Sequence, residues 1–310
     1  MTKGIDVVTV GHALVDIRIV VDRLPGPDEE AEIREEVRGA GGSAVNVSID
    51  TSKLGGKSGI IAKIVFDSFG RIVFEELWKS QVDLRGLRIS PIGSTGFSIV
   101  AISKMGDITI YGSKGVAENF EPWELDRELI SDAKAVHIAS LRLDTSLEAA
   151  KIAKSTGAIV SWDPGRRQAR LGINRLRELL PYIDIVFLNK LEAKAMTGHE
   201  PDVAAETIKS QGPRWVVVKL GSQGSLLYGP KGSKKIPAYK PPKVLDETGA
   251  GDAFAAATLF KLVESEDIVD ALNYASCVAG LKVSRLGSHN IPDYKEMRQL
   301  FSEIDSCPKQ

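Results

Sequence analysis

The 310-residue chain has no excess of either charge and no long apolar run. Lysine and arginine together number 40 and aspartate and glutamate 41, whereas a duplex-binding protein usually carries a clear basic excess. No stretch of about 18 apolar residues is present that could cross a membrane. The apolar run at residues 7–10 is too short for a signal peptide. The sequence therefore predicts a cytoplasmic protein that binds neither nucleic acid nor membranes.

Cysteine and histidine are also scarce. The two cysteines, Cys277 and Cys307, are too few for a disulfide-rich framework, and neither has a partner at zinc-ligand spacing. The four histidines show no metal-ligand spacing either. The pattern G-x-x-x-x-G-K-[ST] of P-loop nucleotide-binding proteins does not occur. A zinc site and a P-loop kinase are therefore not expected.

Hydrophobic residues make up 43% of the chain, enough for a sizeable core. The hydrophobic residues include several short continuous apolar runs, which are typical of strands buried on both faces of a parallel sheet. They alternate with helical patterns, so we predict a doubly wound, mostly parallel α/β sheet with helices on both faces. The predicted strands are 7–10, 60–64, 135–139, 158–162, 183–188 and 215–219, and the predicted helices 43–54, 146–155, 174–180, 191–197 and 204–210.

Two segments break this alternation. Residues 17–21 and 31–37 flank a Pro-Gly-Pro turn, and residues 96–103 and 107–112 flank a turn that contains Gly106, so each segment resembles a β-hairpin. We expect the hairpins, at about residues 14–40 and 93–112, to form a small lid sheet on a single domain that spans residues 1–310. Such a lid could exclude water from a reaction.

A run of small residues, Thr248-Gly249-Ala250-Gly251-Asp252, precedes a strong helix-forming stretch. Backbone N–H groups at a helix N-terminus are unpaired and favour an anion, and glycines let the backbone approach a phosphate. Asp252 is ionised at neutral pH, since aspartate has an ordinary pKa near ~4, and could accept a proton there. Taken alone, the run could equally be an ordinary helix cap.

A second motif lies about 200 residues earlier, where Gly41-Gly42 is followed by Asn46. The two motifs, in this order, resemble the signatures of the PfkB, or ribokinase-like, carbohydrate kinase family. Asp163-Pro164, Asn189…Glu192 and Lys219…Gly224 match the family as well, so the resemblance covers nearly the whole chain. It implies a ribokinase-like fold and an ATP-dependent phosphoryl transfer to a hydroxyl of a small sugar-like molecule.

The resemblance also implies roles for individual residues. Asp252 would be the catalytic base, and the N–H groups of Gly249, Ala250 and Gly251 would stabilise the transferring phosphoryl group. The residues implied for the acceptor are His12, Asp16, Gly41, Gly42 and Asn46. Those implied for the nucleotide are Asn189, Lys219, Gly221, Gly224 and Ser276. Mg²⁺ is expected at Asn189 and Glu192, and K⁺, which some members bind, at Asp246, Thr248, Arg285 and Gly287. A homodimer through the lid is also expected.

Several of these residues have a plainer structural interpretation. Asp16 could be a turn residue and Asn46 a polar position on a helix face. Asn189 and Glu192 have the spacing of a helix capping box. Gly224 could simply allow a tight turn.

The chain departs from the family pattern mainly on the substrate side. Glu247 stands where threonine is usual, Lys63 and Phe66 replace glycines, and the stretch from Lys114 to Ala117 replaces a common Gly-Ala-Asn. The segment that begins at Gly11 resembles archaeal nucleoside kinases of the family, which favours a nucleoside or ribose-like acceptor.

Other acceptors stay open at this point. Arg166, Arg167 and Arg170 could instead bind the phosphate of a sugar phosphate, and fructose and 2-keto-3-deoxygluconate are further acceptors of the family. A non-catalytic sugar-sensing protein on the same fold is an alternative of another class. The intact Gly-Ala-Gly-Asp run argues against that alternative, since a pure binder needs no base.

Overall fold

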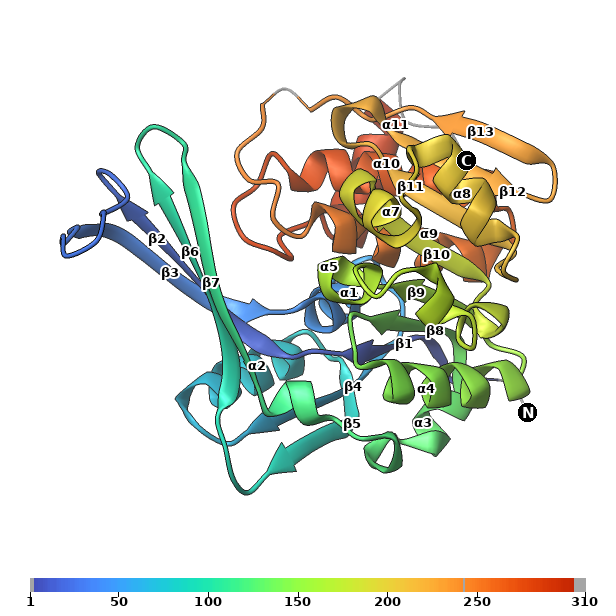
Figure 1. Ribbon diagram of the computed structural model, residues 1–310, viewed down its shortest axis with the longest axis horizontal. Helices are drawn as coiled ribbons and strands as arrows, with labels where there is room; N and C mark the ends of the chain where they lie inside the picture. Colours follow the sequence, from blue (N-terminus) through green and yellow to red (C-terminus); the bar gives the residue numbers. More distant parts are fainter. Residues whose placement is uncertain (1–2, 242, 304–310) are drawn as a thin grey trace.

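The computed structural model describes residues 3–241 and 243–303 of the chain. A nine-stranded sheet carries helices on both faces, and a four-stranded sheet projects from it as a lid (Figure 1). The predicted architecture, a mostly parallel α/β sheet with a small β-lid, is confirmed. None of the helices in the described ranges is both long and apolar enough to span a bilayer.

The large sheet has the strand order β13-β12-β11-β10-β9-β8-β1-β4-β5. From β5 to β11 every neighbouring pair is parallel, and β12 and β13 add an antiparallel edge. Its strands are β1 (Ile5–Gly11), β4 (Ser58–Val65), β5 (Asp83–Ser90), β8 (Ala133–Ala139), β9 (Ile159–Asp163), β10 (Ile185–Asn189), β11 (Trp215–Lys219), β12 (Ser225–Gly229) and β13 (Gly232–Ile236).

The helices lie in two layers. One layer packs on one face of the large sheet through α1, α9 and α10, and the other covers the opposite face through α3, α4, α7 and α8. The α-helices are α1 (Ser43–Lys53), α2 (Ser68–Lys79), α3 (Arg127–Ser131), α4 (Leu143–Ser155), α5 (Gly165–Ala169), α6 (Ile173–Leu176), α7 (Lys190–Thr197), α8 (Pro201–Lys209), α9 (Ala250–Ser265), α10 (Ile268–Lys282) and α11 (Tyr294–Glu303). Short 3₁₀ helices are η1 (Val116–Asn119), η2 (Pro122–Glu124), η3 (Leu180–Tyr182) and η4 (Gly221–Gln223).

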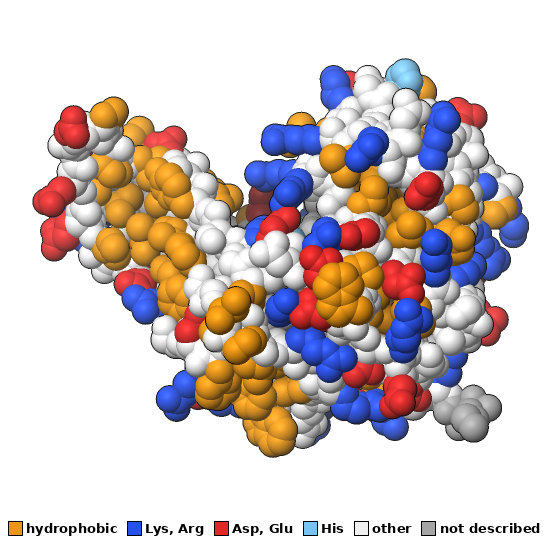
Figure 2. Space-filling model, turned by 60° about the horizontal axis from the view of Figure 1, so that its bottom comes forward, with side chains coloured by type: hydrophobic (Ala, Val, Ile, Leu, Met, Phe, Trp, Pro, Cys, Tyr) orange, Lys and Arg blue, Asp and Glu red, His pale blue; other side chains and the backbone are white. Residues whose placement is uncertain are grey.

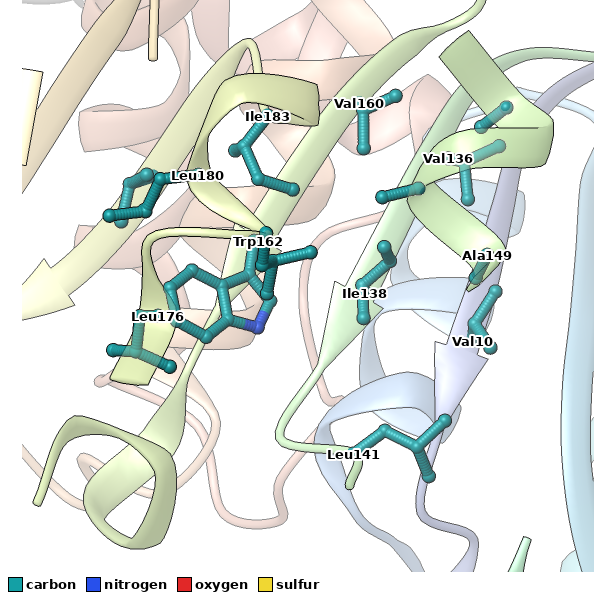
Figure 3. Close-up of a cluster of buried hydrophobic side chains, with 14 of the residues drawn as sticks. Val10, Val136, Ile138, Leu141, Ala149, Val160, Trp162, Leu176, Leu180 and Ile183 are labelled. Atoms are coloured by element: carbon teal, nitrogen blue, oxygen red, sulfur yellow. The ribbon is translucent and has the colours of Figure 1, made fainter. Parts of the chain in front are cut away.

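Trp162 is the largest fully buried side chain of the core. It lies in β9 among Leu176, Leu180 and Ile183 (Figure 3). Aromatic side chains bury more apolar surface than any others, so Trp162 anchors the carboxyl end of β9. The next residue, Asp163, is thereby fixed at the edge of the sheet where ligands bind in open α/β folds.

The lid sheet has the order β3-β2-β6-β7 and confirms that the two hairpins pair with each other. Its central strands run parallel, with Asp16 beside Ser98 and Arg18 beside Val100. The lid strands are β2 (Leu14–Val21), β3 (Ile33–Gly41), β6 (Thr95–Ser103) and β7 (Ile108–Gly115).

Asp67 fastens the base of the lid to the large sheet. Its carboxylate accepts from the backbone N–H of Gly70, which caps α2, and from that of Thr95, the first residue of β6, at 2.7 and 2.8 Å. A β-carbon on Gly70 would lie 1.8 Å from the Val65 carbonyl oxygen, so only glycine fits this turn. The one carboxylate therefore orients both a core helix and a lid strand.

The substitutions at Lys63 and Phe66 lie beside this turn. Lys63 extends to Glu124, with 2.7 Å between its Nζ atom and the carboxylate, and Phe66 is exposed. Of the two cysteines, Cys277 is buried in α10, whereas Cys307 lies outside the described residues.

Candidate active site

Asp252 lies in the first turn of α9, three residues after the N-cap residue Gly249. The backbone restricts that N-cap position to glycine. Gly249 has φ +78°, and a β-carbon there would lie 1.7 Å from the carbonyl oxygen of Ser288. The first-turn N–H groups of a helix have no intrahelical partner and favour an anion. That of Ala250 is already bound to the Glu247 carbonyl oxygen at 3.1 Å. This leaves Gly251 and Asp252 as the better-placed donors of the turn.

The Asp252 carboxylate is held by the helix that carries the first motif. The side-chain amide of Asn46, in α1, donates to its Oδ2 atom at 2.7 Å, and Ser43 also hydrogen-bonds to it. Burial raises the pKa of Asp252, and the charge of Asp163 acts in the same direction, while the Asn46 donor opposes them. The net result is a raised pKa, which makes this carboxylate a stronger base than an exposed aspartate.

Lys219 provides a positive charge behind the start of α9. Its Nζ atom lies 2.8 Å from the Asp163 carboxylate and 3.1 Å from where a β-carbon of Gly251 would be. Gly251 therefore leaves room for this ammonium group. Burial disfavours the charge, but Asp163 holds the pKa of Lys219 above its ordinary value. A permanent cation beside a helix N-terminus strengthens the attraction for a phosphate.

The residues predicted for the acceptor include Asp16 of β2 and the glycine pair at the end of β3. A β-carbon on Gly41 would lie 2.2 Å from Asp16 Oδ2, and one on Gly42 would lie 2.5 Å from the His12 carbonyl oxygen. Both glycines thus make room for the acceptor-side residues beside them. Burial raises the pKa of Asp16, and the negative charge of Asp252 adds to the effect. Asp16 and Asp252 therefore lie close enough for each charge to act on the other.

His12, which directly follows β1, is buried. Burial, together with the positive charges of Lys114 and Arg167, lowers the pKa of His12 to about 3. The imidazole is consequently neutral at physiological pH, where it can donate or accept a hydrogen bond but adds no charge. Lys114 ends β7, and Arg167, in α5, pairs with Glu118. Lys114 of β7 and Arg167 of α5 thus place two positive charges near His12, one of the residues predicted for the acceptor.

Asn189 and Glu192 form the capping box of α7, with both hydrogen bonds at 2.9 Å. The plainer interpretation of their spacing therefore holds, and it does not exclude a role toward a metal. Burial raises the pKa of Glu192, and the neighbouring Asp163 carboxylate raises it further.

The donors available for Mg²⁺ are thus few. Among the described residues no group of three or more His, Cys, Asp or Glu side chains converges on one point. One or two carboxylates suit Mg²⁺, which keeps several waters and binds substrate phosphates. Glu192 and Asp163 fit this requirement, since the two carboxylates are near enough for the charge of Asp163 to raise the pKa of Glu192, and both act on the pKa of Lys219.

The residues predicted for the nucleotide are spread along one side of the sheet. Gly224 has φ +89°, and a β-carbon there would lie 2.0 Å from the Ile236 carbonyl oxygen, so this glycine is required by the turn into β12. Gly221 also has a positive φ but faces open space. Ser276 lines a cavity of about 390 Å³ together with Asn273 and residues 237–240. The structure therefore places Ser276 in a hollow and does not bring it into contact with Lys219.

The four residues predicted for a monovalent cation are only partly brought together. Asp246 accepts from the backbone N–H groups of Thr248 and Gly287, each at 2.9 Å. The side chain of Arg285 instead pairs with Glu296. Asp246 also contacts two side-chain cations, Arg18 of the lid at 2.6 Å and the fully buried Lys282.

The sequence analysis gave no role to several residues of this region. Asp163, named there only as part of a family motif, directly follows a predicted strand, so its position at the carboxyl edge of the sheet was a usable signal. Arg18, Lys282 and His289 stand in no local pattern, because their partners are remote in the sequence or belong to another element. His289 contacts Asn46 at 3.4 Å on one side and Glu76 at 2.9 Å on the other.

Known proteins share this architecture and these motifs. The pattern described as "pfkB family carbohydrate kinase" matches residues 5–294. The chain is 34% identical over 297 residues to an ATP-dependent ribose-1-phosphate kinase of Halopiger xanaduensis, which covers 96% of this chain and 98% of that protein. It is 28% identical to a nucleoside kinase of Methanothermobacter thermautotrophicus, with 97% of each covered.

Two solved structures add the fold and its ligands. Ribokinase of Arabidopsis thaliana, complexed with ribose and ATP, has a TM-score of 0.87 at 27% identity, covering 96% of this chain and 98% of that one. A putative ribokinase II of E. coli, in complex with ATP and Mg²⁺, has a TM-score of 0.82 at 25% identity, covering 96% and 99%. The chain belongs to the pfkB family of carbohydrate kinases, phosphotransferases that use ATP and an alcohol group as acceptor.

Proposed function

We propose that the protein transfers the terminal phosphate of ATP to a hydroxyl of a ribose-based acceptor, with Asp252 as the catalytic base. The observation that carries this proposal is the position of Asp252. Its carboxylate lies at the N-terminus of α9, is held by Asn46, and is close to Asp16 of the lid. An acceptor held by Asp16 and a phosphate held at the helix N-terminus would therefore meet at one carboxylate.

The chemistry follows from these positions. Asp252 takes the proton of the acceptor hydroxyl as its oxygen bonds to phosphorus, and the bond from phosphorus to the ADP oxygen breaks. The N–H groups of Gly251 and Asp252 and the Lys219 ammonium stabilise the charge on the transferring group. Glu192 and Asp163 would hold Mg²⁺, which neutralises phosphate charge when bound. The lid and the core form one kinase domain, with the hollow between them as the reaction site (Figure 2).

Lys114 and Arg167 favour an acceptor that itself carries a phosphate. Both charges act on His12 at the acceptor side, and a phosphate is a natural partner for two cations of this kind. The relative named as a ribose-1-phosphate kinase supports the same class of acceptor. We therefore infer that ribose 1-phosphate is preferred over an uncharged nucleoside. A nucleoside is the second candidate, supported by the relative of that name.

An acceptor panel in an ATP-coupled assay tests this preference. Ribose 1-phosphate should give a higher kcat/KM than ribose, adenosine, fructose or ketodeoxygluconate. Lys114→Met and Arg167→Met should each lower it for the phosphorylated acceptor by about tenfold or more, with little change for ribose. Arg170→Met, in the same basic segment, is the matched control. Equal losses for charged and uncharged acceptors would refute the phosphate assignment, and a faster nucleoside would favour the second candidate.

We also propose that two copies associate through the lid. Cross-strand neighbours share a face of a sheet, and Val37, Arg18, Val100 and Ile110 lie in one such row. Val37 and Ile110 are 64% and 57% exposed, and hydrophobic side chains gather over the lid in Figure 2. Apart from Arg18, whose guanidinium reaches Asp246 of the core, this row is apolar, and an exposed apolar sheet face commonly marks an interaction surface. This face of the lid continues toward the candidate active site, which favours the lid of a second copy as the surface that covers it.

A further inference from the structure

The buried ammonium group of Lys282 lies where the sequence pointed to a monovalent cation. Its Nζ atom donates to the Asp246 carbonyl oxygen at 2.8 Å and lies 3.7 Å from the Asp246 carboxylate. The side chain is fully buried at the end of α10. An ammonium group has the charge of K⁺ and a similar size, and it can donate three hydrogen bonds. Lys282 thus contacts the oxygens of Asp246, one of the four residues predicted for K⁺.

Arg18 adds a second cation from the opposite side. Its guanidinium Nη2 atom lies 2.6 Å from Asp246 Oδ2 and 3.1 Å from Thr248 Oγ1. Three donors therefore surround the Asp246 carboxylate: Arg18, the Thr248 N–H and the Gly287 N–H. Oxygen atoms that already accept from such donors have little capacity left to coordinate a metal cation.

This cluster contains its own positive charges and needs no added ion. Burial lowers the pKa of Lys282, and the charge of Arg18 adds to this effect, whereas the carboxylates of Asp246 and Asp50 favour the ammonium form. Asp50 is fully buried in α1, and neither of its carboxylate oxygens has a hydrogen-bond partner in the described part of the chain. Burial raises the pKa of Asp50 well above its ordinary value, which favours its neutral form. The charge of Asp246 is thus already met by Arg18 and Lys282, and no uncompensated carboxylate is left for an added cation.

We propose that the Lys282 ammonium, assisted by Arg18, takes the place of the monovalent cation beneath the Gly249–Asp252 turn, so that this kinase works without K⁺. The residues named for K⁺ therefore do not fit that ion here. The Lys282 ammonium fixes Asp246. Asp246 in turn holds the backbone N–H groups of Thr248 and Gly287, and the two loops that carry them meet where Gly249 lies against Ser288. Arg18 belongs to the lid, so the same cluster also connects lid position to the phosphate-binding turn. This inference rests on the proposed phosphoryl transfer at Asp252.

The wild-type protein provides the first test and needs no substitution. Desalted protein is compared in chlorides of K⁺, NH₄⁺ and tetramethylammonium at equal ionic strength, by thermal unfolding and by ATP-coupled turnover. We expect the same melting temperature in all three and rates that agree within about twofold, because a native-state ligand would raise the melting temperature specifically. A K⁺-specific rise in either quantity would overturn the inference. If no acceptor is turned over, the proposed function fails, while the melting temperatures still decide the question of the cation.

Lys282→Ala provides the second test, with Lys261→Ala on the neighbouring helix as the matched control. The first variant should lose stability and at least about tenfold in rate, and should regain part of both with K⁺ or NH₄⁺ but not with tetramethylammonium. The control should behave like wild type in every salt. A folded Lys282→Ala protein that keeps full activity, or that no small cation rescues, would contradict the replacement. If this variant does not fold, the wild-type comparison alone decides.

Discussion

Asn46 and Asp252 are 206 residues apart in the sequence, yet the Asn46 amide donates to the Asp252 carboxylate at 2.7 Å. The two signatures of the family thus meet in a single hydrogen bond between α1 and α9. The predicted role of Asn46 toward the acceptor stays a prediction, and its amide also contacts the proposed base. We propose that this contact orients Asp252 and favours its charged form.

This hydrogen bond predicts a shift in the pH profile of the reaction. Asp252 must be ionised to accept a proton, so kcat/KM falls as the pH drops through its raised pKa. Asn46→Ala removes a donor that lowers this pKa, so the acidic limb should move to higher pH. Asn290→Ala, whose amide contacts only the exposed Leu286 carbonyl among the described residues, is the control. An unchanged limb with a uniformly lower rate would show that Asn46 acts on structure alone.

Much of the fold could be predicted because buried parallel strands are continuous apolar runs. These apolar runs predicted the central strands of the large sheet, and the two hairpin-like segments that break their alternation with helices predicted the lid. The edge strand β5 carries Arg85 and Arg88 and shows no such run. Helix α2 was missed although its Asp67 cap and its buried positions Val73 and Leu77 were there to be found.

The candidate site, like the fold, could be predicted from the sequence only in part. Gly249 and Asp252 stand in a local motif whose physics can be stated from sequence alone. Arg18 and His289 are 228 and 243 residues from the partners that they contact, so no spacing indicates them. Lys282 looks like an ordinary helical lysine, and only its complete burial beside Asp246 shows its importance.

The raised pKa of Asp252 also predicts a gain in stability when its charge is removed. Burial raises this pKa, so the neutral acid stabilises the fold below the ordinary value of 3.8, and that contribution is lost as the pH rises through the folded-state pKa. At neutral pH the charged group is therefore destabilising, and Asp252→Asn should melt at a higher temperature than wild type.

Asp83→Asn provides a control of opposite sign. Burial opposes the charge of Asp83, but hydrogen bonds from Arg85 outweigh it and lower the pKa of Asp83. Removing that carboxylate should lower the melting temperature at neutral pH. Thermal unfolding at pH 7 measures both variants, and a decrease for Asp252→Asn would contradict the assigned direction.

Two glycines with positive φ provide a matched pair for the phosphate-binding turn. A β-carbon at Gly249 would lie 1.7 Å from the Ser288 carbonyl oxygen, whereas one at Gly221 would meet nothing within 4 Å. Gly221→Ala should therefore cost only about 1–2 kcal/mol for the left-handed backbone. Gly249→Ala should cost more and should abolish turnover, because Ser288 and the start of α9 must separate. Similar losses of stability and rate for both variants would show that the close contact is unimportant.

The apolar face of the lid predicts a dimer that a single charge should disrupt. Ile110→Glu places a carboxylate in the row with Val37 and Val100, where a lid-to-lid contact would bury it without a partner. Light scattering should then show a monomer, whereas wild type and Trp123→Glu, altered at a 79% exposed side chain of η2, should be dimers. A monomeric wild type would rule out the association.

The most direct test of the whole account is the turnover of Asp252→Asn. ADP formation is measured with ATP, Mg²⁺ and the preferred acceptor, and ATP binding is measured on the same protein by calorimetry. The account predicts a rate lower by about 10²–10⁴-fold, as expected for loss of a general base, with ATP affinity nearly unchanged. A rate within tenfold of wild type would contradict the assignment of Asp252 as the base.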